Sequence, residues 1–259
     1  MKTPIKDPNV YVCSEVVKSI IPIESKVKSL LLFSGQIEFP LAYAGYDIEI
    51  ATNKYVTYEF WNCALRDPYL ISEMAIDLNS KMQSAQVYLF QSDWPTYKDP
   101  YFRSALYFLL NRYSLTGTIS HGDYRIGNFT PLSTQNLQRF FEDERSSKIK
   151  IRYYNSEKYL DAFEFIEDDE VVLLPAGRLS LSPLNRVTAV GHETYDLNHR
   201  ELKDFLNNQN KKFVLVYKYN PRLATLYKNY NITMVNSFGA ITKNPELAED
   251  IIVTNLETR

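Results

Sequence analysis

Short apolar runs alternate with amphipathic stretches along most of this chain. Apolar, often β-branched runs bounded by turn-forming residues predict buried strands at 27–35 (with its turn), 46–52, 148–154, 170–174, 213–219, 231–236 and 249–255. Apolar residues that recur every three or four positions predict helices at 55–82, 99–115, 132–147 and 196–212. Strands alternating with helices indicate an α/β fold with a doubly wound, mostly parallel sheet. The last two strands lie close together in the sequence, which favours an antiparallel pair at the sheet edge.

The helix predicted at 99–115 has the clearest boundaries. Asp99 is placed to cap its first turn, and Pro100 suits the first helical position because proline lacks the N–H that this position leaves unpaired. The helical pattern over 55–82 is interrupted near Pro68.

The stretch at 116–133 is rich in Gly, Thr and Ser and predicts an extended loop or hairpin. Ser133 or Thr134 is expected to cap the helix that follows. We therefore expect a core made of residues 1–65 and 148–259, with residues 66–147 inserted as a helical and hairpin segment that resembles a target-recognition region.

Composition narrows the protein class. The 259 residues are 45% hydrophobic and carry a net charge of −2, which supports a sizeable core and argues against a polybasic nucleic-acid binder. The two cysteines, Cys13 and Cys63, have no metal-type or disulfide-type spacing, so a reducing cytoplasm is expected. No stretch approaches 18 apolar residues and no signal-like N-terminus is present, which predicts neither membrane spanning nor secretion.

The stretch "DEVVLLPAGRLS" (169–180) predicts a buried strand that ends in a tight turn at Pro175, Ala176 and Gly177. Ligands of open α/β sheets bind outside the carboxyl ends of the strands, so such a turn is a common place for catalytic side chains. Here the turn offers no acid, base or nucleophile.

Five segments, in order, resemble the Dam-type DNA adenine-N6 methyltransferase family. "LLLFSGQIEF" (30–39) resembles the family's first motif, Phe-x-Gly-x-Gly, in which Phe33 and Gly35 match. "ALYFLLNRYSLTG" (105–117) resembles the end of a family helix, in which Asn111, Arg112, Tyr113 and Gly117 match. "RIGNFTPLS" (125–133) and the terminal "EDIIVTN" resemble two further family segments, and "DEVVLLPAG" falls where the family has Asp-x-Val-Tyr-x-Asp-Pro-Pro-Tyr. The resemblance implies a class I methyltransferase-like fold, S-adenosylmethionine as cofactor, DNA as substrate, and a bacterial or phage source.

This chain departs from the family where the acceptor base is held. The family takes an acid, a proline pair and an aromatic ring from Asp-Pro-Pro-Tyr. Here Leu174, Ala176 and Gly177 replace the acid, the second proline and the ring, and only Pro175 remains.

The part that resembles the cofactor site departs as well. Ile37 replaces the second glycine of the first motif, where it is expected to intrude on the methionine part of the cofactor. Asn53 falls near the acid that would bind the ribose, and no Gly-Gly-Lys contact is present at the N-terminus. Phe33, Gly35, Ile37 and Asn53 are therefore expected to be vestigial, and no cofactor is expected to bind.

The resemblance also implies a surface for DNA or for a partner. Its candidate residues are Arg112, Tyr113, His121, Tyr124, Arg125 and Asn128, which offer groups for phosphates, base edges and stacking. The competing interpretation is that Asn111, Arg112 and Tyr113 anchor the loop to the helix. The segment is sparsely basic, which weakens the DNA interpretation.

No replacement chemistry is evident. "GHETYDLNHRE" (191–201) lacks the H-E-x-x-H spacing of a zinc site, and it is interpreted as a solvated loop and helix start, with no metal expected. The charge runs "FEDERSSK" and "FIEDDE" are interpreted as solvated faces.

Three functions remain open from the sequence. The first is a catalytically inactive relative that binds or scaffolds a partner protein, such as an active methyltransferase subunit. The second is an active S-adenosylmethionine-dependent DNA adenine methyltransferase whose catalytic motif, at the end of the strand predicted at 170–174, has diverged. Residues such as Arg178, Ser180 and Asn185 would then hold the acceptor base. The third is a sequence-tolerant DNA binder of phage or mobile-element origin that occupies methylation sites.

Overall fold

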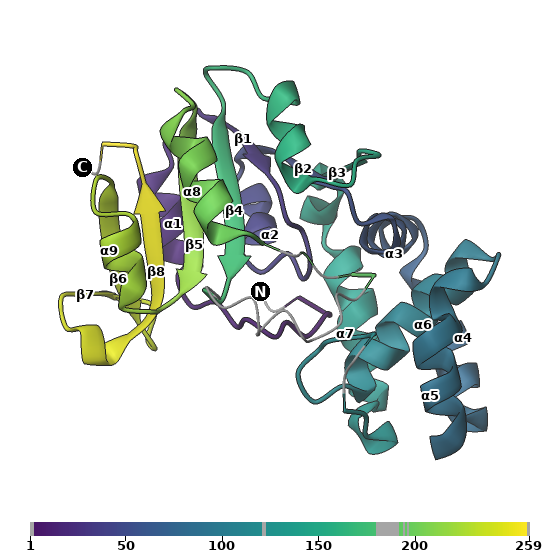
Figure 1. The fold of residues 1–259 in the computed structure, drawn as a ribbon. Helices are drawn as coiled ribbons and strands as arrows, with labels where there is room; N and C mark the ends of the chain where they lie inside the picture. The colour runs from purple at the N-terminus through teal and green to yellow at the C-terminus, as the bar shows by residue number, and fades with distance from the viewer. Residues whose placement is uncertain (1–2, 121–122, 180–191, 194, 196, 258–259) are drawn as a thin grey trace.

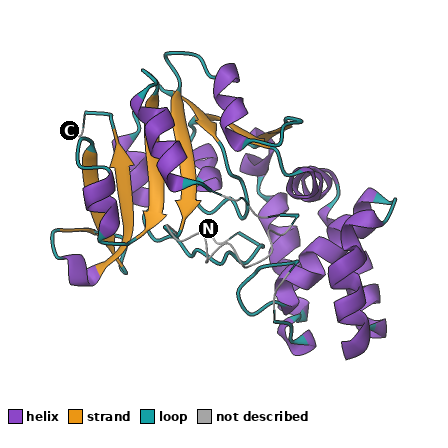
Figure 2. Ribbon diagram, viewed as in Figure 1, coloured by secondary structure: helices purple, strands orange, loops and turns teal. Residues whose placement is uncertain are grey.

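The computed structural model describes residues 3–120, 123–179, 192, 193, 195 and 197–257. Within this part of the chain, strands β1 to β8 form one sheet in the order β3-β2-β1-β4-β5-β8-β6-β7. Figure 2 shows the strands in orange between helices in purple. Strands β1 to β5 pair in parallel, whereas β8 runs antiparallel to both β5 and β6, and β7 runs antiparallel to β6. The predicted doubly wound, mostly parallel α/β fold is confirmed, and its strand order is compatible with a Rossmann-like methyltransferase fold.

The strands are β1 (Lys26–Ser29), β2 (Asp47–Thr52), β3 (Lys150–Tyr153), β4 (Val171–Gly177), β5 (Lys212–Lys218), β6 (Asn231–Asn236), β7 (Ile241–Thr242) and β8 (Ala248–Thr254). The helices are α1 (Ser14–Ile20), α2 (Glu38–Tyr43), α3 (Tyr55–Arg66), α4 (Pro68–Lys81), α5 (Ser84–Asp93), α6 (Pro100–Tyr113), α7 (Pro131–Glu142), α8 (His199–Asn207) and α9 (Arg222–Leu226). Short 3-10 turns are η1 (Trp94–Thr96), η2 (Ile126–Asn128), η3 (Glu144–Lys148), η4 (Tyr159–Phe165) and η6 (Pro245–Leu247).

Alternate residues of the central strands enter two separate cores. Leu173 and Val214 belong to the core that includes α1 and α2, whereas Val172 and Leu215 belong to the core beneath α8 and α9. Successive side chains of a strand point to opposite faces, so an uninterrupted apolar run is what a strand covered on both faces requires. Figure 1 shows these two helix pairs on opposite faces of the sheet.

Helices α3 to α7 lie to one side of the sheet, next to β3 (Figure 1). The Asp99 carboxylate accepts a hydrogen bond from the Phe102 N–H (2.7 Å), which confirms the predicted start of α6, and Asp67 caps α4 in the same way just before Pro68. Apolar residues of α6 and α7 share one core with Val27 and Ile48 of the sheet. The helical segment therefore packs on the sheet core.

Several predicted boundaries are wrong, and helices α1, α2, α5 and α9 and strand β7 were not predicted. Strand β4 continues through Pro175 to Gly177, because a bulge at Ala176 accommodates a proline that cannot donate to the ladder. Helix α7 begins after Thr130, which forms a capping box with Ser133, so neither Ser133 nor Thr134 is the cap. Helix α8 begins only after Asn198, whose side chain accepts from the Glu201 N–H.

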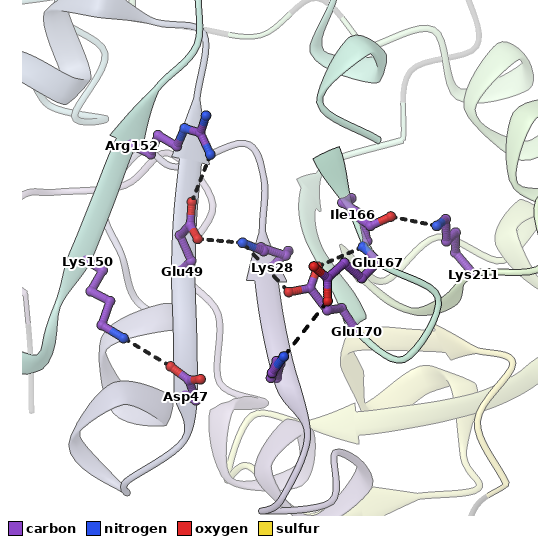
Figure 3. A network of polar contacts seen from close by, with 10 residues as sticks. Lys28, Asp47, Glu49, Lys150, Arg152, Ile166, Glu167, Glu170 and Lys211 are labelled. Atoms are coloured by element: carbon purple, nitrogen blue, oxygen red, sulfur yellow. Dashed lines mark hydrogen bonds and ion pairs between the residues drawn. The ribbon is translucent and has the colours of Figure 1, made fainter. Parts of the chain in front are cut away.

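A row of charged side chains crosses β3, β2 and β1 (Figure 3). Glu49 lies between Lys28 and Arg152, and Lys28 also contacts Glu170 at 3.7 Å. Opposite charges on neighbouring strands stabilise a sheet. Glu170 is buried and paired here, so interpreting the whole run "FIEDDE" as a solvated face is wrong for this residue.

The packing around Gly35 leaves no room for a side chain, whereas Gly45, which has a similar backbone conformation, lies in open space. Both adopt positive φ angles (69° and 96°), but a Cβ at Gly35 would lie 2.3 Å from the buried Phe39 ring, whereas one at Gly45 would meet nothing within 4 Å. We expect Gly45→Ala to cost about 1 kcal/mol of unfolding free energy for its left-handed backbone. Gly35→Ala is expected to cost roughly 2 kcal/mol more, because the ring must also move. Urea unfolding measures both, and equal losses would contradict this assignment.

Candidate functional site

A cavity of about 140 Å³ lies outside the carboxyl ends of β1 and β4. These neighbouring strands form the point where the strand order reverses, which is the usual ligand position in open α/β sheets. Its described lining comes from five parts of the chain: Asp7, Pro8, Asn9 and Tyr11 near the N-terminus; Leu31, Phe33, Ser34, Gly35, Gln36 and Glu38 after β1; Thr118; Pro175, Ala176 and Gly177 at the end of β4; and Glu193, Tyr195 and Leu197. Leu31 in its wall has a φ of 70°, which is strained for a residue other than glycine.

The N-terminal arm, defined as residues 3–13, crosses this edge of the sheet. Its Lys6 exchanges backbone hydrogen bonds with the buried Asn111 side chain, both at 2.9 Å. The Tyr11 hydroxyl accepts from the Gly177 N–H at 2.7 Å, and the Asp250 carboxylate accepts from the N–H of Val12 at 2.6 Å. The arm is thus fixed to the helical segment, to β4 and to β8.

Tyr195 closes the opposite side of the cavity. Its hydroxyl shares a 2.5 Å hydrogen bond with the Thr52 hydroxyl and donates to the Leu32 carbonyl at 3.3 Å. Thr52 ends β2 and Leu32 follows β1, so the Tyr195 side chain covers the carboxyl ends of both strands. Desolvation raises the pKa of Tyr195 well above 10, so this phenol stays neutral at physiological pH.

Three carboxylates line the cavity. Desolvation raises the pKa of Asp7 to about 6, against hydrogen bonds from Ser34 and the Asn9 N–H that lower it. Desolvation also raises the pKa of the buried Glu38 to about 7, and the charge of Asp7 adds to that rise. Glu193 accepts from the N–H groups of residues 119 and 120 (2.8 and 2.9 Å) and from the Ser120 hydroxyl (2.6 Å).

Of the four residues that stand where the family has Asp-Pro-Pro-Tyr, only three line this cavity. Pro175, Ala176 and Gly177 line it, whereas Leu174 is fully buried in the core beneath α8. Gly177 has a φ of 71°, and a Cβ there would lie 2.8 Å from the Asn9 amide. An aromatic side chain at position 177 would therefore collide with the N-terminal arm.

The four residues expected to be remnants of a cofactor site do not lie together. Phe33 and Gly35 line the cavity, and the Phe33 carbonyl accepts from the Trp61 indole at 3.0 Å. Ile37 turns into the sheet core and does not line the cavity, so its side chain is not the expected obstruction. Asn53 donates its amide to the backbone carbonyls of Ser156 (3.0 Å) and Glu157 (3.4 Å).

The residues of the candidate DNA or partner surface have mixed environments. Tyr113 is buried and donates to Asn79 of α4 (2.8 Å), whereas Asn128 donates to the Tyr113 carbonyl (2.9 Å) and so holds the loop to α6. Arg125 is exposed, and Tyr124 forms a bridge with Ser114. Desolvation lowers the pKa of Arg112, whose Nε is buried without a hydrogen-bond partner among the described residues. His121 lies outside the described residues.

The prediction that 191–201 is a solvated loop and helix start is wrong for Glu193 and His199. Glu193 and His199 are buried because each finds polar partners: three donors for the carboxylate, and the Tyr217 hydroxyl at 3.1 Å for His199 Nδ1. Among the described residues, no group of three or more His, Cys, Asp or Glu side chains is arranged to hold a metal ion. The tip residue Arg178 is exposed, and Ser180 and Asn185 lie outside the described residues.

Sequence reasoning missed Asp7, Tyr11, Glu38 and Tyr195. Glu38 carried a signal, since a carboxylate within the apolar run "IEFPLAY" needs a reason to be there. The other three come from segments far from the strands in sequence, and no local pattern marks them.

Neither the comparison with models of known protein families nor the comparison with curated proteins gives a match to this chain. Cys13 and Cys63 are free and buried. No described helix combines the length and apolarity needed to cross a bilayer.

The raised pKa values of Asp7 and Glu38 predict a specific pH dependence. A carboxyl that titrates higher in the folded state contributes stability that is present below its unfolded pKa and lost as the pH rises, here between about 4 and 7. Asp7→Asn and Glu38→Gln remove this loss, so each variant should gain on the parent by on the order of 1–3 kcal/mol across that range.

Unfolding curves at intervals from pH 4 to 8 measure the difference. Gly45→Ala changes no titratable side chain, so its difference from the parent should not vary with pH. A flat difference for Asp7→Asn and Glu38→Gln as well would show that neither carboxyl is desolvated as described.

Proposed function

We propose that this chain is a catalytically inactive methyltransferase-like protein that serves as a binding or scaffolding subunit. The observation that carries the proposal is that the chain's own side chains cover the carboxyl ends of β1, β2 and β4. Tyr195 bonds to Thr52 and to the Leu32 carbonyl, and Tyr11 bonds to Gly177. A methyl donor and an acceptor base would need this same space.

The described residues do not fit S-adenosylmethionine. The remaining cavity of about 140 Å³ is close to an engineered cavity of about 150 Å³ that holds benzene, a molecule much smaller than this cofactor. At the end of β2, where a ribose would need a carboxylate, Thr52 bonds to Tyr195 and Asn53 donates to backbone carbonyls. The tip of β4 supplies no acid. No catalytic step is therefore assigned to this site.

A protein partner is favoured over DNA. The inserted segment 66–147 contains eight Lys and Arg against nine Asp and Glu, and Arg103 and Arg145 are already paired with Glu59 and Asp143. DNA affinity depends mainly on free cations that neutralise phosphates. Helix α5 has no basic residue and no acid before Asp93, and it exposes large apolar side chains at Tyr88 and Leu89 (62% and 65% exposed). Two neighbouring exposed apolar side chains on a helix with so little charge make α5 the contact site that we propose.

The first test of this proposal is cofactor binding. Millimolar S-adenosylmethionine should give no rise in melting temperature and no calorimetric heat, whereas a ligand at about one hundred times its Kd would add about 2.7 kcal/mol of stability. Leu174→Asp should not restore methylation, because the Leu174 side chain lies in the core and away from the cavity. A clear thermal shift with the cofactor would overturn the proposal and favour an active enzyme.

The second test concerns the partner. Affinity purification of the tagged chain from its native host, followed by mass spectrometry, should recover a protein that the double variant Tyr88→Ser/Leu89→Ser loses. Leu132→Ser is the matched control, since Leu132 is an equally exposed leucine on α7 (63% exposed). Retention by the double variant would contradict the assignment to α5. Tight binding of the chain to DNA at physiological salt would contradict the proposed protein partner and identify DNA as the partner.

A further inference from the structure

The cavity beside β1 and β4 is lined by carboxylates that no described residue of its wall balances with a positive charge. Asp7, Glu38 and Glu193 line it, and none of its described lining residues is Lys, Arg or His. None of these three carboxylates forms an ion pair with any described residue. Buried carboxylates in proteins are normally paired, because an unpaired charge in a low-dielectric site is costly.

The three carboxylates differ in how many hydrogen bonds they accept and in how short those bonds are. Glu193 has three donors at 2.6 to 2.9 Å and is held by the loop at 119–120. Glu38 is only 2% exposed, and its hydrogen bonds from the Ser29 hydroxyl and the Ile37 N–H are both long at 3.3 Å; its own backbone N–H is a third donor. Glu38 together with Asp7 therefore retains acceptor capacity that a positively charged donor would use.

Aromatic rings complete the wall. Tyr11, Phe33 and Tyr195 all line the same cavity as the carboxylates. A ring face attracts a cation, and it also provides an apolar surface for a compact hydrocarbon body. Carboxylates and aromatic rings in one cavity, with no basic side chain among its described lining residues, are the chemistry that recognises an organic cation.

Size and ligand geometry distinguish an organic cation from a metal ion. The cavity volume of about 140 Å³ is close to that of an engineered cavity of about 150 Å³ that binds benzene. Among the described residues, no cluster of three or more acidic, His or Cys ligands converges as a metal ion would require. A metal ion would also leave the apolar wall unused.

We propose that this cavity binds a small organic monocation, a primary ammonium on a compact apolar body. Asp7 and Glu38 bind the ammonium, and the three aromatic rings contact the body. The site does not depend on the proposed scaffolding role, because it would bind its ligand whether or not the chain has a protein partner.

The test uses three probes of nearly equal shape on the full chain at pH 8: benzylammonium, benzyl alcohol and benzoate. Benzylammonium at millimolar concentration should raise the melting temperature and give a saturable calorimetric titration. The neutral alcohol and the anion should give neither, because only the cation balances the carboxylates. An equal response to benzyl alcohol, or no response to benzylammonium, would overturn the proposal.

Variants locate the site. Asp7→Asn and Glu38→Gln should each weaken benzylammonium binding about tenfold or more, while Asp77→Asn, which alters an exposed carboxylate of α4, should leave it unchanged. Both variants keep the side-chain shape, and their own melting curves show whether they fold. Lowering the pH to 5 should weaken binding to the parent chain, because protons then compete for Asp7 and Glu38. The facing groups Tyr11 and Tyr195 stay neutral there, since burial raises the pKa of both.

Binding that the Asp7 and Glu38 variants leave unchanged would show that the cation binds elsewhere and would overturn this site. A response to S-adenosylmethionine without a response to benzylammonium would instead remove the proposed function as well. The two failures are therefore distinguishable.

Discussion

The pair of hydrogen bonds between Asn111 and Lys6 fixes the part of the molecule on which the rest of the site depends. The Asn111 side chain is buried at the end of α6, where it donates to the Lys6 carbonyl and accepts from the Lys6 N–H. It also donates to the Gly117 carbonyl at 2.7 Å. One amide thus holds the N-terminal arm and the loop after α6 together, and the arm can then cross the carboxyl edge of the sheet only along one path.

The consequence of that path is that the position where an open α/β sheet normally binds its ligand is largely filled by the protein. Tyr11 reaches Gly177 on β4, and Tyr195 reaches Thr52 and the Leu32 carbonyl on the other side. What remains is a small cavity with an acidic and aromatic wall. The two proposals, that the chain does not bind the large cofactor and that this cavity binds a small cation, therefore rest on the same packing.

The fold could be predicted largely from the sequence, and the site only in part. Continuous apolar runs such as Val171 to Leu174 mark strands covered on both faces, and Asp99 with Pro100 marks the start of α6, because these signals act over a few residues. The tip at Pro175, Ala176 and Gly177 was found for the same reason, since it follows a recognisable strand. Its bulge was missed, because a bulge is defined by the partner strand β5.

The sequence by itself determined the doubly wound α/β class, most of its strands, its longer helices except α5, and the absence of an acid at the end of β4. Only the tertiary structure decided that Ile37 turns into the core, that Glu193 is buried with three donors, and that Asp7, Glu38 and Tyr195 meet at one cavity. The physical reason is distance along the chain. Periodicity and capping depend on neighbours a few residues apart, whereas burial of a carboxylate depends on donors more than seventy residues away.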